Sequence, residues 1–131
     1  MADPTSDHFA WLRTRMAAER TFMAWLRTAA SMIGFGFTIV QFFAKLSRME
    51  GAHPAMRPHA PRMLGLMLIG AGVLGLAFAL HQFRTVVRHL DGPEYAGINT
   101  GHPPASPAVV VAVIVLFIGV FAFTAIVLRA P

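Results

Sequence analysis

The sequence predicts an all-α integral membrane protein with three transmembrane helices and an amphipathic helix ahead of them. The first indication is the composition, because 56% of the 131 residues are hydrophobic and 13% are charged, whereas soluble domains carry about 25% charged residues. The second is the presence of three long apolar runs, since about 20 apolar residues cross the hydrocarbon core. Three short spans predict one membrane domain over residues 1–131.

The first predicted element is an amphipathic helix at about residues 7–20. The apolar residues that this helix can turn toward lipid are Phe9, Trp11, Leu12 and Met16. The stretch before them contains Asp3 and Asp7 and lacks the basic and apolar regions of a cleavable signal peptide. The first membrane helix is therefore expected to remain in the mature protein.

Transmembrane helices are predicted at residues 22–44, 63–83 and 109–128. A proline-containing loop without periodicity separates the first two, and the second helix continues until a break at Asp91-Gly92-Pro93. Three spans place the two termini on opposite sides of the membrane. Six Lys or Arg residues fall on the N-terminal side and five on the other, so the positive-inside rule does not decide the orientation.

Polar residues of the first membrane helix fall on one face, because residues seven apart drift by only about 20° on an α-helix. This spacing relates Arg13 to Arg20 and Arg27, and then to Gly34 and Gln41. We call this set the polar stripe, and it comprises Arg13, Arg20, Arg27, Ser31, Thr38, Gln41 and Lys45. Thr21 and Thr28 lie off the stripe, where a hydroxyl can bond to the backbone. The pentapeptide AWLRT occurs at residues 10–14 and again at 24–28, about four turns apart.

The polar stripe has two interpretations from sequence. An arginine at the bilayer centre costs roughly 2.5–3.5 kcal/mol, so the stripe should face protein or water. Several copies of this small chain would then enclose it, and rings of arginine form an anion-selective constriction that suits phosphate. Alternatively, Arg20 and Arg27 anchor to headgroups, because Arg27 lies only about 7.5 Å inside the predicted boundary. Glu19 is expected to pair with Arg15 or with a neighbour's arginine.

Small residues in the second helix predict close helix packing. Ala71, Gly75 and Ala79 have small-xxx-small spacing, and Gly65, Gly72 and Ala79 repeat every seven residues. Gly34 of the first helix is a further candidate for helix packing. The third helix has no charge and few small residues, so it is expected to face lipid on most sides.

No catalytic residue, metal site or cofactor is predicted. The chain has no cysteine, and its six histidines show no HExxH spacing. No paired carboxylates, nucleophile arrangement or phosphate-binding glycine loop occurs, so an enzyme is not expected. The net charge is +5, but most basic residues flank apolar runs, where they meet lipid headgroups. Membrane lipids and further copies of the chain are the expected partners, and nucleic acid is not.

Residues 19–31, ERTFMAWLRTAAS, resemble the signature of the YidH-like bacterial membrane proteins, also called domain of unknown function 202. Glu19, Thr21 and Trp25 carry the motif together with Arg20 and Arg27, and the resemblance extends over about residues 17–83. It implies a multi-pass protein of the bacterial inner membrane with a cytoplasmic N-terminus and no settled activity.

The same domain resembles the small membrane subunit of the yeast vacuolar transporter chaperone complex, a polyphosphate polymerase. There the domain forms a ring, and basic residues of the first helix line a path for polyphosphate. By this resemblance Glu19 and Arg20 match the motif, and Arg13 matches a basic position one heptad earlier. Arg27 belongs to the bacterial version, and an uncharged polar residue is expected there in the yeast subunit. The predicted function is a homo-oligomeric ring that binds or passes phosphate or polyphosphate, with a non-conducting scaffold or accessory subunit as the alternative.

Overall fold

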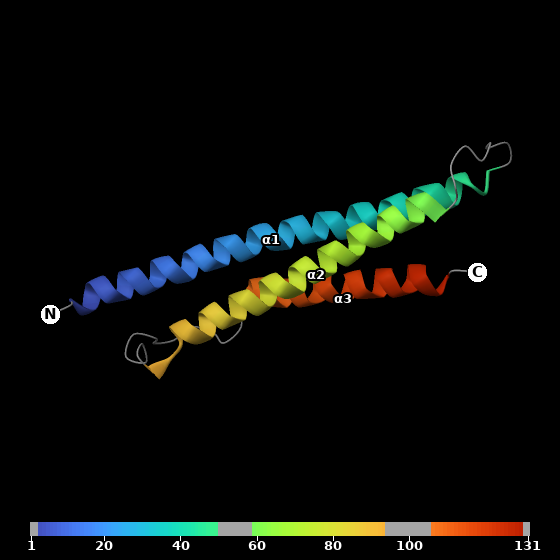
Figure 1. Cartoon of the computed structure of the whole chain (residues 1–131). Coiled ribbons are helices and arrows are strands. Elements are labelled where there is room, and N and C mark those ends of the chain that lie inside the picture. Colours follow the sequence, from blue (N-terminus) through green and yellow to red (C-terminus); the bar gives the residue numbers. More distant parts are fainter. Residues whose placement is uncertain (1–2, 50–58, 94–105, 130–131) are drawn as a thin grey trace.

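The structure, a computed structural model, describes residues 3–49, 59–93 and 106–129. This part of the chain is all-α, and its three helices are α1 (Pro4–Leu46), α2 (His59–Leu90) and α3 (Pro107–Leu128). Each is long and apolar enough to cross a membrane, which confirms the predicted fold class. α1 and α2 run antiparallel and side by side, α3 lies along α2, and the two ends of the chain lie at opposite ends of the bundle (Figure 1).

α1 is one continuous helix that contains both the predicted amphipathic segment at 7–20 and the predicted span at 22–44. No glycine or proline interrupts the chain between Thr5 and Ile33, so nothing ends the helix between the two segments. The helix starts at Asp3, whose side chain accepts a hydrogen bond from the Thr5 backbone N–H. Its 43 residues extend over about 65 Å, roughly twice the hydrocarbon thickness. The N-terminal segment therefore continues the membrane helix without a break.

α2 and α3 also extend beyond the boundaries expected from sequence. α2 exceeds residues 63–83 at both ends, and it ends at Leu90, directly before the predicted break at Asp91-Gly92-Pro93. α3 begins at Pro107, two residues earlier than expected. Proline is tolerated at this first helical position because its missing N–H would have no partner within the helix.

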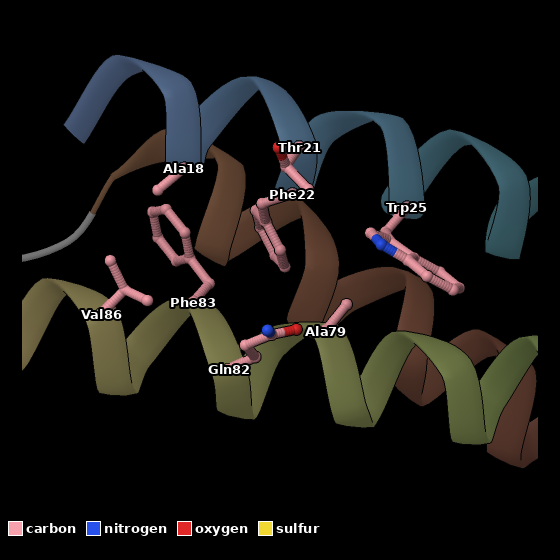
Figure 2. A pocket seen from close by; sticks show the side chains of 8 residues that line it. All are labelled: Ala18, Thr21, Phe22, Trp25, Ala79, Gln82, Phe83 and Val86. Atoms are coloured by element: carbon pink, nitrogen blue, oxygen red, sulfur yellow. The ribbon is translucent and has the colours of Figure 1, made fainter. Parts of the chain in front are cut away.

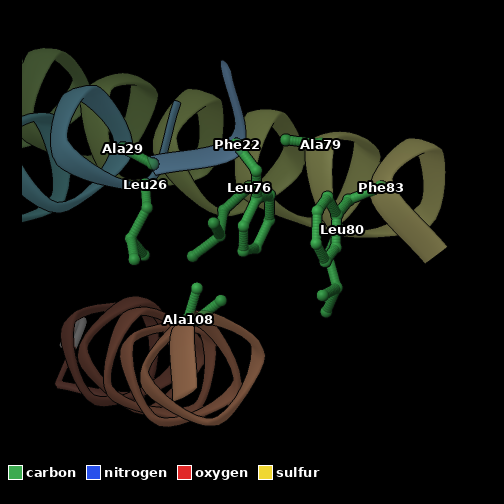
Figure 3. Packing of buried hydrophobic residues seen from close by; sticks show 9 residues of the cluster. Phe22, Leu26, Ala29, Leu76, Ala79, Leu80, Phe83 and Ala108 are labelled. Carbon is green, nitrogen blue, oxygen red and sulfur yellow. The ribbon is translucent and has the colours of Figure 1, made fainter. Parts of the chain in front are cut away.

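The core forms where α1, α2 and α3 meet, as Figure 3 shows. Phe22 of α1 stacks on Phe83 of α2 with ring centroids 4.7 Å apart, and both side chains are buried. α3 contributes small side chains, Ala108 and Ala112, to the same cluster. The three helices therefore share one hydrophobic core rather than two separate contacts.

α1 and α2 approach each other closely at Gly36 and Gly65. A Cβ atom added at Gly36 would lie 2.6 Å from the Gly65 carbonyl oxygen, and one added at Gly72 would lie 2.9 Å from the Ala29 oxygen. The seven-residue repeat of Gly65, Gly72 and Ala79 thus faces its neighbours, where small residues let the backbones come together.

The other small residues are placed differently. Gly34 and Ala71 are exposed, and a Cβ at Gly34 would meet no atom within 4 Å. Gly75 is half-buried, with the Trp25 ring 3.9 Å from an added Cβ. Gly34 and Ala71 therefore do not serve close packing within one chain. Gly34 lies on the outer face of α1, and Ala79, which also belongs to the seven-residue repeat, is the buried member of the small-xxx-small ridge.

α3 packs through a narrow strip of small residues. Gly119 is buried, and an added Cβ would lie 2.7 Å from Val73 and 2.8 Å from Ile33. Phe117 and Phe121, on the other side of the helix, are more than two-thirds exposed. Most of the α3 surface therefore points outward, where lipid would cover it.

Side chains from preceding helices cap the C-termini of α2 and α3. Trp11 Nε1 of α1 donates to the Leu90 carbonyl oxygen at 3.0 Å, and Arg62 of α2 donates to the Ile126 oxygen at 2.7 Å. These carbonyl groups have no partner within their own helix. Trp11 was expected to face lipid, but it is 2% exposed because the continuous α1 carries it alongside the end of α2.

Candidate functional site

The polar stripe lies on the face of α1 that points away from α2 and α3. Phe22, Leu26 and Ala29 mark the buried face, and Arg20 lies about 160° around the helix from Phe22. The exposed members of the stripe are Arg13, Arg20, Arg27, Ser31, Thr38 and Lys45, and Gln41 is half-buried. The structure therefore brings the predicted residues together along one outer surface.

Hydroxyl groups along α1 return to the helix backbone. Ser31 Oγ donates to the Arg27 carbonyl oxygen at 2.9 Å, and Thr38 Oγ1 donates to the Gly34 oxygen at 2.8 Å. Thr21 and Thr28, off the stripe, make the same bond to the residue four before them. The hydroxyl donors in the middle of the stripe thus have hydrogen-bond partners within the helix. The charged groups of the stripe lie toward its two ends.

The arginines of the polar stripe carry the charge of the N-terminal end. Within residues 3–49, 59–93 and 106–129, no carboxylate lies within salt-bridge distance of Arg13, Arg20 or Arg27. Their guanidinium groups are available to an external anion or to lipid phosphate, both of which arginine binds in bidentate geometry.

Arg15, the residue expected to pair with Glu19, is engaged elsewhere. Its Nη1 lies 3.9 Å from Oδ1 of Asp91, just beyond the end of α2. Its guanidinium carbon lies 5.4 Å from the centre of the Trp11 ring. Glu19 is half-buried. Arg15 therefore contributes to the contact between α1 and α2 and not to a pair within α1.

The motif residues Thr21 and Trp25 lie beside the stripe and line a groove between α1 and α2. Figure 2 shows this groove, which has a volume of about 150 Å³, with Gln82 and Val86 on its α2 side. Trp25 is 48% exposed, so a large aromatic surface is left uncovered. The motif thus divides by direction: Phe22 enters the core, Arg20 faces outward, and Thr21 and Trp25 face the groove.

The two AWLRT copies present related but rotated faces. Fourteen residues fall about 40° short of four full turns, so Trp11 is 2% exposed whereas Trp25 is 48% exposed. In the second copy Leu26, 6% exposed, takes the buried position instead. Arg13 and Arg27 both remain on the outer face.

Some contact residues are missing from the sequence-based set. Gly36 is flanked by two phenylalanines, yet its seven-residue spacing from Ala29 was a usable signal for the buried face. Trp11 and Arg15 continue the buried spacing of Phe22 backward, which is visible only if one unbroken helix is assumed. Arg62 carried no such signal, because its partner Ile126 lies in another helix.

Histidine and carboxylate side chains do not gather at a metal site in the described ranges. No group of three or more His, Asp or Glu side chains comes together there. His53 and His102 lie outside the described residues.

A comparison with protein families matches residues 10–89 to the model described as "Domain of unknown function (DUF202)". No curated protein and no solved structure matches the chain. The matched region contains the whole polar stripe and the groove between α1 and α2, and it ends one residue before the end of α2. The match thus covers the α1–α2 pair from Ala10 onward and none of α3.

Proposed function

This chain belongs to the DUF202 family, and on that premise we propose that it forms a homo-oligomeric ring in the bacterial inner membrane whose central path takes anions. In this proposal the polar stripe of α1 lines the path and the N-terminus lies in the cytoplasm. Phosphate and polyphosphate are the anions that fit best, because guanidinium groups bind phosphate oxygens in pairs.

One observation carries the proposal, the outward position of the polar stripe. In a single chain this face would meet lipid, which is unfavourable for the polar and charged side chains that lie inside the hydrocarbon, Arg27 among them. Further copies of α1 across a symmetry axis remove that cost by covering the stripe. Such a ring has α1 inside and α2 and α3 outside, and it turns Arg20 and Arg27 into two rings of positive charge.

The choice of anion is supported by the motif. By the resemblance to the yeast vacuolar transporter chaperone subunit, we take Glu19 and Arg20 to correspond to its motif and Arg13 to a basic position one heptad before it, whereas Arg27 belongs to the bacterial version. Arg13 and Arg20 are exposed on the outer face of α1 in this chain, as lining residues of such a path require.

The test combines subunit counting with anion flux. Native mass spectrometry from mild detergent should give one closed ring of several copies, and phosphate flux into proteoliposomes should be lost in Arg20→Ala and Arg27→Ala. Arg129→Ala is the matched control, because Arg129 is exposed just after the end of α3, away from the polar stripe, and should leave flux unchanged. A monomer or dimer cannot enclose a path, and this result would reject the proposal.

A non-conducting accessory subunit is the second candidate. It is favoured by the bonding of the Ser31 and Thr38 hydroxyls to the α1 backbone, which leaves the middle of the stripe with satisfied donors. It is also favoured by the uncovered ring of Trp25, which a helix of another protein could contact. A partner that copurifies in fixed ratio, together with absent flux, is the result expected from this candidate.

A further inference from the structure

A second pocket, of about 360 Å³, lies where α1, the C-terminal end of α2 and the N-terminus of α3 meet. Its polar lining comes from all three regions: Arg15 of α1, Arg84 and Arg88 of α2, Asp91 just after α2, and Ser106 just before α3. No member of the polar stripe lines it, so this pocket is separate from the path proposed above.

The pocket carries excess positive charge. Three guanidinium groups and one carboxylate give its named lining a formal charge of +2 (three minus one). Asp91 lies next to Arg15, and no carboxylate of the described ranges lies within salt-bridge distance of Arg84 or Arg88. These two arginines are four residues apart on α2, where like charges repel. An anion held between them relieves that repulsion.

A buried hydroxyl adds a hydrogen-bonding group without a partner. Ser106 is the N-cap residue of α3, and its side chain makes no capping hydrogen bond. Its Oγ atom is buried, and it has no hydrogen-bond partner within the part of the chain that the structure describes. Leaving such a group unsatisfied is unfavourable, because it has lost its hydrogen bonds to water without replacing them. The N-terminus of α3 also adds partial positive charge beside it.

The pocket lies at the level of one membrane surface. α3 has 22 residues and extends over about 33 Å, just enough to cross the hydrocarbon, so Ser106 falls near a boundary. The remaining pocket wall is apolar and consists of Phe83, Val87 and Val109. The full lining thus combines a basic end with an apolar side at the depth of lipid headgroups.

We propose that this pocket binds the phosphate group of an anionic phospholipid. Arg84 and Arg88 contact the phosphate oxygens, and Ser106 Oγ donates to one of them. Phe83, Val87 and Val109 cover the first apolar part of the lipid. The bound lipid joins the end of α2 to the start of α3, two elements that this chain connects through residues 94–105.

The experiment measures lipid retention in the full-length protein. The protein is placed in nanodiscs of phosphatidylcholine that contain a minor share of phosphatidylglycerol. It is then released from the nanodiscs in the mass spectrometer, and the phosphatidylglycerol molecules that remain bound to it are counted. Arg84→Ala/Arg88→Ala should weaken retention at least about tenfold, since a hydrogen bond to a charged group contributes about 1.5–3 kcal/mol. The charge-matched control Arg48→Ala/Arg129→Ala, at the other end of the bundle, should retain the lipid as wild type does. Equal retention in both double variants would overturn the proposal.

Two thermal-unfolding measurements distinguish a bound phospholipid from a soluble anion. The first measurement adds inorganic phosphate, at constant ionic strength, to protein in phosphatidylcholine alone, and it should not raise the thermal midpoint. If phosphate raises the midpoint as much as phosphatidylglycerol does, the site binds a soluble anion and the lipid assignment is overturned. Ser106→Ala should remove part of the rise that phosphatidylglycerol gives and should not lower the midpoint without it. A Ser106→Ala protein that keeps the full rise contradicts the role of Ser106. These results are independent of ring formation and flux, which are tested through Arg20 and Arg27.

Discussion

The indole Nε1 of Trp11 donates a 3.0 Å hydrogen bond to the carbonyl oxygen of Leu90, the last residue of α2. The Arg15 guanidinium, which is 3.9 Å from Asp91, also lies within 5.4 Å of the Trp11 ring centre. These contacts join the N-terminal part of α1 to the C-terminal end of α2, at one end of the pair, so the N-terminal extension of α1 belongs to the folded bundle.

Trp11→Phe should lower the free energy of unfolding by about 0.5–1.5 kcal/mol, because it removes the hydrogen-bond donor and retains most of the buried ring. Thermal unfolding in mild detergent measures the loss. Trp25→Phe is the matched control, since Trp25 is half-exposed in the groove and has little packing to lose. Equal effects of the two substitutions contradict a stabilising role for the Trp11–Leu90 bond.

Gly36→Ala should destabilise the protein by about 1–3 kcal/mol, because the new Cβ would lie 2.6 Å from the Gly65 oxygen and 2.8 Å from Ile69. Gly34→Ala, two residues away, should be neutral or should stabilise α1 by up to about 1 kcal/mol, since nothing lies within 4 Å of its Cβ. The comparison needs only thermal midpoints of the two variants. If both are neutral, α1 and α2 do not approach closely at Gly36.

Arg62→Ala should destabilise the end of α3 by about 1.5–3 kcal/mol, because it removes a charged donor from the Ile126 carbonyl oxygen. Limited proteolysis at the C-terminal end of α3 reports the local loss, and it should be faster in this variant. Arg48→Ala removes an exposed charge from the same end of the bundle and should leave proteolysis unchanged. An unchanged rate in Arg62→Ala would show that this contact does not hold the helix end.

Ser31→Cys should react with a charged, water-soluble thiol reagent about tenfold or more faster than Phe117→Cys, because only a hydrated thiol ionises. Ser31 lies on the polar stripe, and Phe117 is 71% exposed on the outer side of α3. The natural chain has no cysteine, so each variant reports one position. Slow reaction at both positions argues against a water-filled path and favours the accessory-subunit candidate.

The fold class and the three membrane helices follow from local sequence, because length and apolar composition alone decide whether a helix can span a bilayer. The end of α2 at Leu90 follows likewise from the Asp91-Gly92-Pro93 break. The continuity of α1 does not follow from the hydropathy pattern, because the change from amphipathic to apolar near residue 20 alters the surroundings of the helix and not its backbone. The absence of glycine and proline from residues 5–33 was the better guide.

The burial and direction of residues that pack against another helix were less predictable from the sequence. α2 has two faces with small residues, and only the position of α1 decides that Gly65 and Gly72 are buried while Ala71 is exposed. The polar stripe could be read from helical spacing, but its direction relative to α2 and α3 could not. The pocket formed by Arg84, Arg88 and Ser106 combines residues that are separated by residues 94–105, so no local pattern indicates it.

The continuity of α1 also determines the orientation of a protein that is fused to the chain ahead of this helix. A helix that starts at Pro4 and contacts α2 at Trp11 and at Gly36 has a fixed direction and rotation relative to α2. A protein fused through a helical linker to this end would rotate by about 100° and move by about 1.5 Å for each residue added. The start of α1 is thus an attachment point of defined orientation, suited to orienting a fiducial domain for electron microscopy or a pair of distance probes.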